Sequence, residues 1–296
     1  MTDPSPFRIG LSPWGTTLDG VRRVAAAAVD AGADALWLGD GLLVVDDFPR
    51  WSGGLDPFVE LAWLAGRHPG VGIGVGAAVL PLRDVHTVVK QAATLDQLTE
   101  GRFILGVAPG FWEREFAYRG LSFKERGKRF DDLLGALRAA LNGEGYDGKD
   151  ITIPPPAEGG RLSPVPATPG GPPLWLAGAR PTFERALRLG LPFQSRAISP
   201  EGLKPLADEW FARGGTELAI RLSIAVADAV PPSDAAVDSV SQQNGLVGPP
   251  AYLAEQLAAY RDLGLVDVSL IPGRDDDTSL ATIETLATAV FPALGR

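Results

Sequence analysis

Residues 71–116 read VGIGVGAAVLPLRDVHTVVKQAATLDQLTEGRFILGVAPGFWEREF, and this stretch decides the fold. The apolar run over residues 71–79 predicts a strand, and Asp84 is a good N-cap for a helix that ends at Gly101. A second apolar run over residues 103–107 predicts the next strand. Both predicted strands end in small residues or proline, which is where a parallel α/β barrel carries its chemistry.

The same alternation of strand and helix continues along the whole chain. Six further apolar segments predict strands: residues 7–11, 35–40, 174–177, 192–196, 218–227 and 268–271. Eight such units favour α/β architecture with a single (β/α)8 TIM barrel over residues 1–296. A doubly wound open sheet is the competing topology. It usually carries a glycine fingerprint after its first strand, whereas SPWGTT follows the first strand here.

Residues 143–173 are dense in glycine and proline, with one weak strand candidate over residues 150–153. We interpret this segment as an irregular insertion after strand four, because the strand–helix alternation resumes beyond it. Asp96 and Arg102 flank the end of the preceding helix, where their charges predict a structural ion pair.

Composition excludes several classes of function. The net charge of −9, without a basic cluster, disfavours a nucleic acid or an anionic membrane as partner. The absence of cysteine excludes disulfide scaffolds and thiolate chemistry, and two histidines are too few for a histidine-rich metal centre, so we expect no metal site. The first residues lack the pattern of a signal peptide, and no apolar run is long enough to span a membrane. We expect a cytoplasmic protein.

Three segments together resemble the bacterial luciferase-like flavin and deazaflavin oxidoreductase family of monooxygenases and related enzymes. The central one is VVKQAATLDQLTEGRFILGVAPGFWEREFAYRGLSFKERGKRFDDLLGALRAAL, and the others are PLWLAGARPTFERALRLG and PPAYLAEQLAAYRDLGLVDVSLIP. The resemblance implies a TIM barrel that binds either an 8-hydroxy-5-deazaflavin coenzyme or FMN. It also implies a homodimer and, for flavin chemistry, a separate flavin or deazaflavin reductase.

Small residues at the ends of strands three and four are candidate walls for a tricyclic ring, because little side chain intervenes there. The predicted cofactor-binding residues are Gly76, Ala77, Ala78, Val79, Ala108 and Gly110. The resemblance implies a non-prolyl cis peptide near Gly76–Ala77 or Ala77–Ala78. Ordinary close packing of small residues is the alternative interpretation.

A phosphate site is predicted where strand five gives way to a helix. Ala177, Gly178, Ala179 and Arg180 open that helix, and its free amides, its dipole and the arginine charge all favour an anion. Many helix starts have this composition and bind nothing, so the prediction depends on its place at the catalytic face of the barrel.

The sharpest departure from the family follows strand two. The resemblance to the deazaflavin-using relatives implies an Asp-His pair there, with the histidine beside the reactive ring carbon, but Asp40 is followed by Gly41. Asp40 and Glu113 remain as candidate catalytic residues. The candidates for the substrate pocket are Trp14, Gly41, Trp51 and Trp112, although packing explains each tryptophan equally well.

These observations favour an oxidoreductase that exchanges hydride between a deazaflavin coenzyme and a small organic substrate. Hydride transfer needs orientation of the cofactor and no protein acid, so the missing histidine does not exclude it. An FMN-dependent monooxygenase that uses reduced flavin and oxygen is the alternative enzyme. A non-catalytic flavin- or ligand-binding relative is the alternative of another class, and Gly41 is the reason to consider it.

Overall fold

A computed structural model of the chain describes residues 7–13, 17–43, 54–156, 160, 162–230, 245–273 and 275–296. Eight parallel strands close into a barrel: β1 (Arg8–Leu11), β2 (Ala35–Leu38), β3 (Gly72–Val79), β4 (Phe103–Ala108), β7 (Leu174–Gly178), β8 (Phe193–Arg196), β9 (Leu218–Val226) and β11 (Asp267–Ile271). The pairing of β8 with β9 and of β11 with β1 completes the circle. The TIM-barrel prediction is confirmed.

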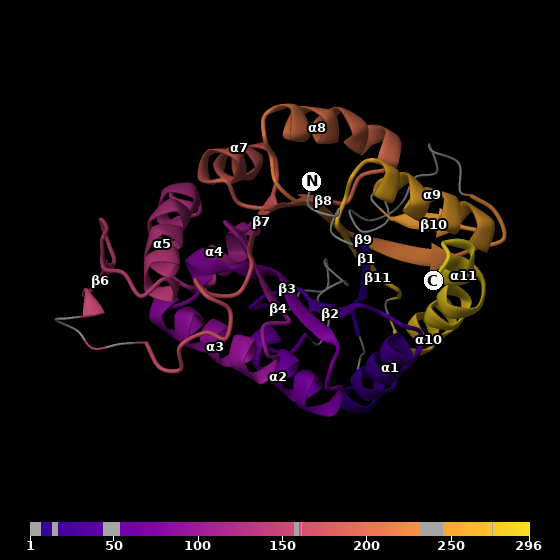
Figure 1. Cartoon of the computed structure of the whole chain (residues 1–296), viewed down its shortest axis with the longest axis horizontal. Coiled ribbons are helices and arrows are strands. Elements are labelled where there is room, and N and C mark those ends of the chain that lie inside the picture. Colours follow the sequence, from indigo (N-terminus) through magenta and orange to yellow (C-terminus); the bar gives the residue numbers. More distant parts are fainter. Residues whose placement is uncertain are drawn as a thin grey trace.

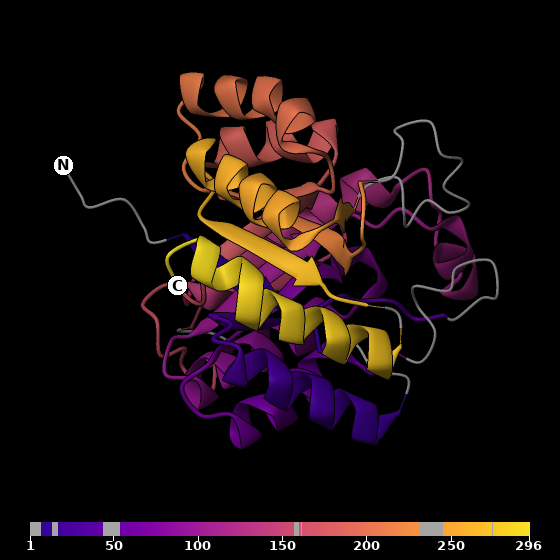
Figure 2. The ribbon, with the colours of Figure 1, turned by 90° about the vertical axis from the view of Figure 1, so that its right-hand side faces the viewer.

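Helices surround the barrel, as Figure 1 shows. They are α1 (Leu18–Asp30), α2 (Pro57–Arg67), α3 (Val85–Leu98), α5 (Arg126–Leu141), α7 (Arg180–Leu189), α8 (Pro200–Ala212), α9 (Pro250–Asp262) and α10 (Asp276–Thr285). Shorter elements are the 3-10 turn Leu80–Leu82, α4 (Glu113–Tyr118), β10 (Leu246–Gly248), the π-helical turn Leu286–Val290 and α11 (Phe291–Ala293). Helices α1 and α10, which come from opposite ends of the chain, pack side by side (Figure 2). None of the helices that the structure describes has the length and apolarity to cross a membrane.

The interleaved glycines of β3 make room for a tryptophan inside the barrel. Trp37 of β2 is fully buried, and a Cβ atom at Gly74 or at Gly10 would overlap its indole ring. The ring packs against Trp175 of β7, with 5.6 Å between the ring centroids. These indoles fill the barrel interior together with Ala35, Ile104 and Ala219, which shows which residues of each strand face inward.

An ion pair lies at the amino-terminal end of the barrel, where the first and last strands meet. The Arg8 Nε atom donates to Asp267 Oδ2 at 3.2 Å, and the guanidinium also lies 5.7 Å from the Trp175 ring centroid. Asp267 has no exposed surface. Burial raises the pKa of Asp267 to about 7, although the Arg8 charge acts in the opposite direction.

The insertion over residues 143–173 includes a short antiparallel pair, β5 (Tyr146–Asp147) and β6 (Thr152–Ile153), which contacts α5. Asp96 anchors the rest of the insertion by accepting bonds from the Thr168 amide at 2.7 Å and from its hydroxyl at 3.0 Å. The predicted Asp96–Arg102 ion pair is therefore wrong. Arg102 pairs with Glu100 at 3.5 Å on the surface, while the buried Asp96 satisfies backbone of the insertion.

Candidate active site

A patch of small, partly exposed residues lies at the carboxyl ends of adjacent strands. Gly76 and Ala77 of β3, Ala108 of β4 and Gly178 of β7 each keep solvent-accessible surface, although strand residues before them are buried. The Gly76–Ala77 peptide is cis, as the resemblance implies, and the pairing of β3 with β4 shifts register between Val75 and Ala78. We call the four accessible residues the small-residue bed.

Two of the predicted cofactor contacts do not belong to this bed. Ala78 has no exposed surface and lies in the main hydrophobic core, because the register shift turns it away from the barrel interior. Val79 is 6% exposed and packs against Leu82 and Phe116. The prediction that residues 76–79 all face a ligand is thus corrected to Gly76 and Ala77.

Gln194 of β8 lies beneath the bed, and the sequence reasoning missed it. Its side chain is 2% exposed, and its Oε1 atom lies 3.1 Å from the position that a Cβ atom at Gly76 would take. Its Nε2 atom has no hydrogen-bond partner in the described part of the chain. A buried amide donor without a partner is costly, and a ligand with a carbonyl oxygen would satisfy it. The available signal was a lone amide in the strand PFQSR.

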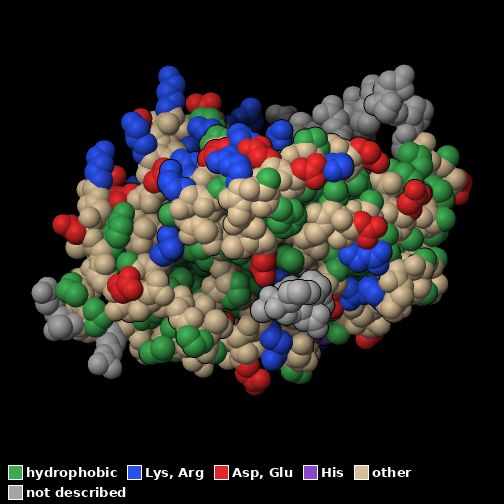
Figure 3. Space-filling view, turned by 45° about the horizontal axis from the view of Figure 1, so that its top comes forward, with side chains coloured by type: hydrophobic (Ala, Val, Ile, Leu, Met, Phe, Trp, Pro, Cys, Tyr) green, Lys and Arg blue, Asp and Glu red, His purple; other side chains and the backbone are tan. Residues whose placement is uncertain are grey.

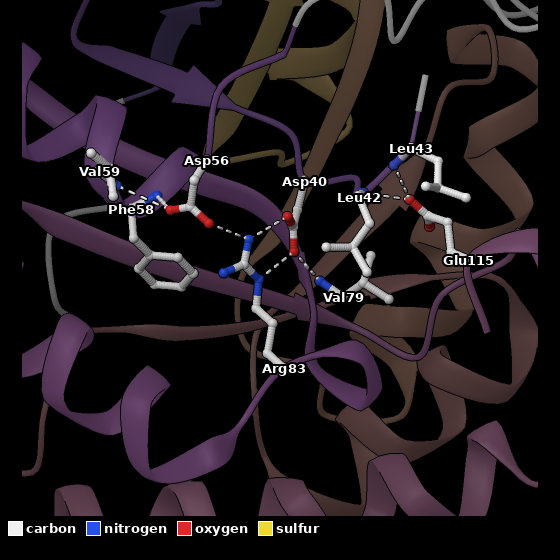
Figure 4. Close-up of polar contacts among 9 residues, drawn as sticks. All are labelled: Asp40, Leu42, Leu43, Asp56, Phe58, Val59, Val79, Arg83 and Glu115. Carbon is white, nitrogen blue, oxygen red and sulfur yellow. Dashed lines mark hydrogen bonds and ion pairs between the residues drawn. The ribbon is translucent and has the colours of Figure 1, made fainter. Parts of the chain in front are cut away.

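Asp40 is held by Arg83 in a buried pair (Figure 4). Asp40 Oδ2 accepts from Arg83 Nε at 2.7 Å and from the Val79 amide at 2.8 Å, while Oδ1 accepts from Arg83 Nη2 at 2.5 Å. Arg83 also contacts Asp56 at 2.9 Å. Both oxygens of Asp40 are therefore engaged, so Asp40 positions the end of β3 against the loop after β2, while its role as an acid or base stays a prediction.

The pKa of Arg83 responds to opposing influences. Burial lowers the pKa of this guanidinium, whereas its hydrogen bonds and charge interactions with Asp40 and Asp56 raise it by more, so the pKa lies above its ordinary value. The Arg83 guanidinium is therefore cationic at any physiological pH.

Glu115 contacts the loop beside Gly41, where Glu113 was predicted to act. Glu113 is exposed at the first position of α4, whereas Glu115 is 4% exposed. Glu115 Oε1 accepts from the Leu42 amide at 2.6 Å and from the Leu43 amide at 3.4 Å (Figure 4). Burial raises the pKa of Glu115 and the Asp40 charge adds to this, although the two amides lower it. Glu115 thus fixes the start of the loop that follows β2.

Of the four residues predicted to line the substrate pocket, the structure describes two. Gly41 is exposed beside Asp40, and Trp112 is half-buried at the N-cap of α4. Trp14 and Trp51 lie outside the described residues. Gly110 has φ of 80°, and a Cβ atom there would lie 2.7 Å from Val79, so backbone conformation and packing account for this glycine without a ligand.

The predicted phosphate segment is split between barrel and surface. Ala177 is 9% exposed, whereas Gly178 and Ala179 are accessible where α7 begins. The Arg180 guanidinium donates to both oxygens of Glu209 at 2.6 Å and also pairs with Glu184. Its charge is thus engaged between α7 and α8, and its pairing with phosphate stays a prediction; backbone amides at the start of α7 are further donors. Figure 3 shows acidic and basic side chains interspersed on this side of the molecule.

No three histidine, cysteine or acidic side chains gather in a metal-binding arrangement within the described ranges. The strand ends described so far offer small apolar walls, backbone amides, the Gln194 amide and the groups around Asp40. This set can bind and orient a planar ligand.

Comparison with known proteins places this geometry in a family. The profile described as luciferase-like monooxygenase matches residues 4–229. The alkanal monooxygenase alpha chain of Photorhabdus laumondii is 25% identical over 167 residues, which cover 55% of this chain and 44% of that protein. The chain spans less than half the length of the curated relatives it matches.

Solved structures agree on the fold. The FMN-bound oxygenating constituent of 3,6-diketocamphane monooxygenase from Pseudomonas putida superposes with a TM-score of 0.75 at 16% identity, covering 97% of this chain and 98% of that one. An F420-dependent secondary alcohol dehydrogenase, in complex with an F420–acetone adduct, gives 0.76 at 16% identity, covering 98% and 99%. The extent of the profile match, together with the shared barrel, leads to one conclusion: the chain belongs to the luciferase-like monooxygenase family.

Proposed function

We propose that this chain is an oxidoreductase that binds an 8-hydroxy-5-deazaflavin coenzyme and exchanges hydride with a small organic substrate. The observation that carries the proposal is the small-residue bed at the carboxyl ends of β3, β4 and β7, with the unpartnered Gln194 amide beneath it. A planar tricyclic ring needs such a flat, side-chain-poor surface and a polar donor for its carbonyl edge.

The residues of this chain would share the work of holding the coenzyme. Gly76, Ala77 and Ala108 would support the ring, Gln194 would donate to a carbonyl oxygen, and backbone amides near Ala179 would face the phosphate. When bound, the deazaflavin supplies the hydride chemistry, and the protein supplies binding and orientation. The Asp40–Arg83 pair would keep the bed in place by holding the Val79 amide.

Gly41 bears on the choice among enzymes of this family. A glycine at this position provides no proton donor or acceptor, and both oxygens of the adjacent Asp40 are engaged. Hydride exchange relies on proximity and alignment of two bound partners, which the bed can provide without a titrating group.

Equilibrium dialysis of the purified chain against the deazaflavin coenzyme and against FMN tests the proposal. We expect tight binding of the deazaflavin and weak binding of FMN. Ala108→Leu would fill the bed and raise the coenzyme dissociation constant about tenfold or more, whereas Ala251→Leu, on the exposed start of α9, would leave it unchanged. Binding of FMN without deazaflavin would overturn the proposal in favour of the alternative enzyme.

That alternative is an FMN-dependent monooxygenase which takes reduced flavin from a separate reductase. The family description and the FMN-bound camphane monooxygenase support it. A non-catalytic ligand-binding relative is the third reading, supported by Gly41. Turnover separates these cases: reduced deazaflavin with carbonyl acceptors, or reduced FMN with oxygen, would give product for an enzyme, and binding without turnover under both conditions would indicate the non-catalytic relative. We also propose that the chain forms a homodimer and that its substrate is a small molecule.

A further inference from the structure

Arg221 lies in the middle of β9 and faces the inside of the barrel. Ala219, two residues earlier, packs with Trp37 and Trp175 in the barrel interior, and strand alternation places Arg221 on the same face, one layer nearer the carboxyl end. The side chain is surrounded by protein, yet the residue keeps accessible surface. Arg221 therefore keeps some solvent-accessible surface on the inner side of the barrel.

The charge of Arg221 has no counter-ion in contact. Its Nη1 atom donates to the Ser269 hydroxyl at 2.6 Å, and no carboxylate of the described residues lies within ion-pair distance of it. The acidic group that influences it, Asp267, stands in register with Ala219, one layer nearer the amino-terminal end of the barrel, and pairs with Arg8. Burial lowers the pKa of Arg221 to about 10, so the guanidinium stays cationic at neutral pH.

Several other arginines of the chain pair with carboxylates, whereas Arg126 and Arg129 donate to backbone carbonyls. Arg83, Arg180, Arg185 and Arg213 each donate to at least one carboxylate. An enclosed cation without a partner is costly to a folded protein, and the protein as a whole carries a net charge of −9. The cost is offset where an anion enters the site, and a guanidinium with donors left over accepts an oxyanion in a fork geometry.

A second unpartnered donor lies on the neighbouring strand. Gln194 of β8 stands opposite Ala219 in the register, so it projects from the same inner face, and Arg196 stands opposite Arg221. The Gln194 Nε2 atom is buried and without a partner in the described residues. Two adjacent inner strands thus present hydrogen-bond donors to the same interior, and Asp267, one layer below Arg221, is not in contact with either donor among the described residues.

We propose that Arg221 binds the carboxylate of the organic substrate, so that the chain acts on small organic acids. This inference rests on the proposed function, because the anion is a substrate only if the chain is an oxidoreductase. It makes that function more specific by naming the class of substrate. Arg221 would fix the acid group deep in the barrel, beside the small-residue bed, and the apolar remainder of the substrate would extend along it. Arg221 is thus a specificity-determining residue.

Ligand-observed NMR titration of the full chain, without any coenzyme, tests this with the isosteric pair propanoate and propanamide. We expect propanoate to bind about tenfold or more tightly than propanamide, since charge-assisted hydrogen bonds are worth more than neutral ones. Arg221→Gln should abolish the preference. Arg67→Gln, which removes the same charge from the exposed end of α2, should leave it unchanged.

Equal binding of the two ligands by the wild-type chain, or an unchanged preference in Arg221→Gln, would overturn the inference. So would a variant that loses coenzyme affinity but keeps propanoate affinity, because Arg221 would then serve the coenzyme. Where the glutamine variant fails to fold by circular dichroism, Arg221→Lys decides: a several-fold weaker affinity for propanoate supports the fork, and an unchanged one contradicts it. Because the titration contains no coenzyme, failure of the proposed redox function leaves its result interpretable.

Discussion

At the scale of single residues, the carboxylates around the bed hold backbone in place. Asp40 receives the Val79 amide, and Glu115 receives the amides of Leu42 and Leu43. In both cases an acidic side chain compensates backbone donors where a strand has ended and regular pairing no longer does so. Carboxylates in such places therefore have a structural role in holding the backbone.

Replacing Asp40 by asparagine tests this positioning role. Asp40→Asn removes the negative charge beside a buried guanidinium and leaves the half-exposed Asp56 as its charged partner. We expect a loss of about 2–4 kcal/mol in the free energy of unfolding, measured by urea titration. Asp56→Asn, at the more exposed partner, should cost less. A fully stable Asp40→Asn chain would contradict this positioning role.

Glu60 gives a pH-dependent prediction. Burial, with the nearby Asp56 charge, raises its pKa from 4.5 to about 7 in the folded chain. Between those two values only the folded state holds the proton, so its contribution to stability falls as pH rises through this window and is most unfavourable above pH 7. Glu60→Gln should therefore be more stable than the wild type at pH 8, by about 2 kcal/mol, and nearly equal to it near pH 5.

Thermal unfolding of the Glu60→Gln chain at both pH values measures the effect. Glu144→Gln, at an exposed position after α5, is the control and should show no such pH dependence. If the two glutamine variants behave alike at pH 8, Glu60 does not carry an unfavourable charge in the folded chain.

At the scale of elements, the glycine pattern of β3 is a packing requirement. Gly74 accommodates the Trp37 ring from the neighbouring strand, and the outward-facing Ile73 and Val75 are fully buried under the helices. Alternation of glycine with branched residues thus indicates an inner face shared with a large side chain. The sequence alone shows the alternation, but it does not show which aromatic side chain packs against these glycines.

A pair of glycine substitutions tests this requirement. Gly74→Ala should destabilise the chain by about 1–3 kcal/mol, because the added methyl group overlaps the buried indole. Gly66→Ala, in α2 with open space around it, should instead be neutral or stabilising by up to about 1 kcal/mol. Urea unfolding of both chains gives the comparison, and a Gly74→Ala chain as stable as Gly66→Ala would contradict the packing argument.

At the scale of the whole molecule, apolar periodicity predicted the barrel because each strand is short, buried and followed by a helix. The partners of individual side chains escaped prediction for a physical reason: they come from other elements. Arg180 donates to Glu209 of the next helix, and Asp96 accepts from the Thr168 amide of the insertion. Ala78 was assigned to the wrong face because a register shift in β3 cannot be recognised from composition.

Closure of the barrel provides a prediction at this scale. Arg8→Met would leave the buried Asp267 without its partner at the seam between β1 and β11. The pKa of Asp267, already about 7, should rise further, so the chain should lose about 3–5 kcal/mol at pH 8 and less at pH 5, where the folded carboxyl is protonated. The double variant with Asp267→Asn should recover most of the loss; a flat pH dependence would contradict this account.

The paired indoles at the base of the bed have a consequence for how the protein can be observed. Trp37 lies close enough to Gly76 that a Cβ atom there would be 3.2 Å from its ring, and Trp175 lies against it. A chromophore that absorbs in the near ultraviolet and rests on Gly76 would take up their excitation energy. Intrinsic fluorescence of the unlabelled chain therefore reports occupancy of the barrel mouth, and Trp37→Phe would silence much of that signal.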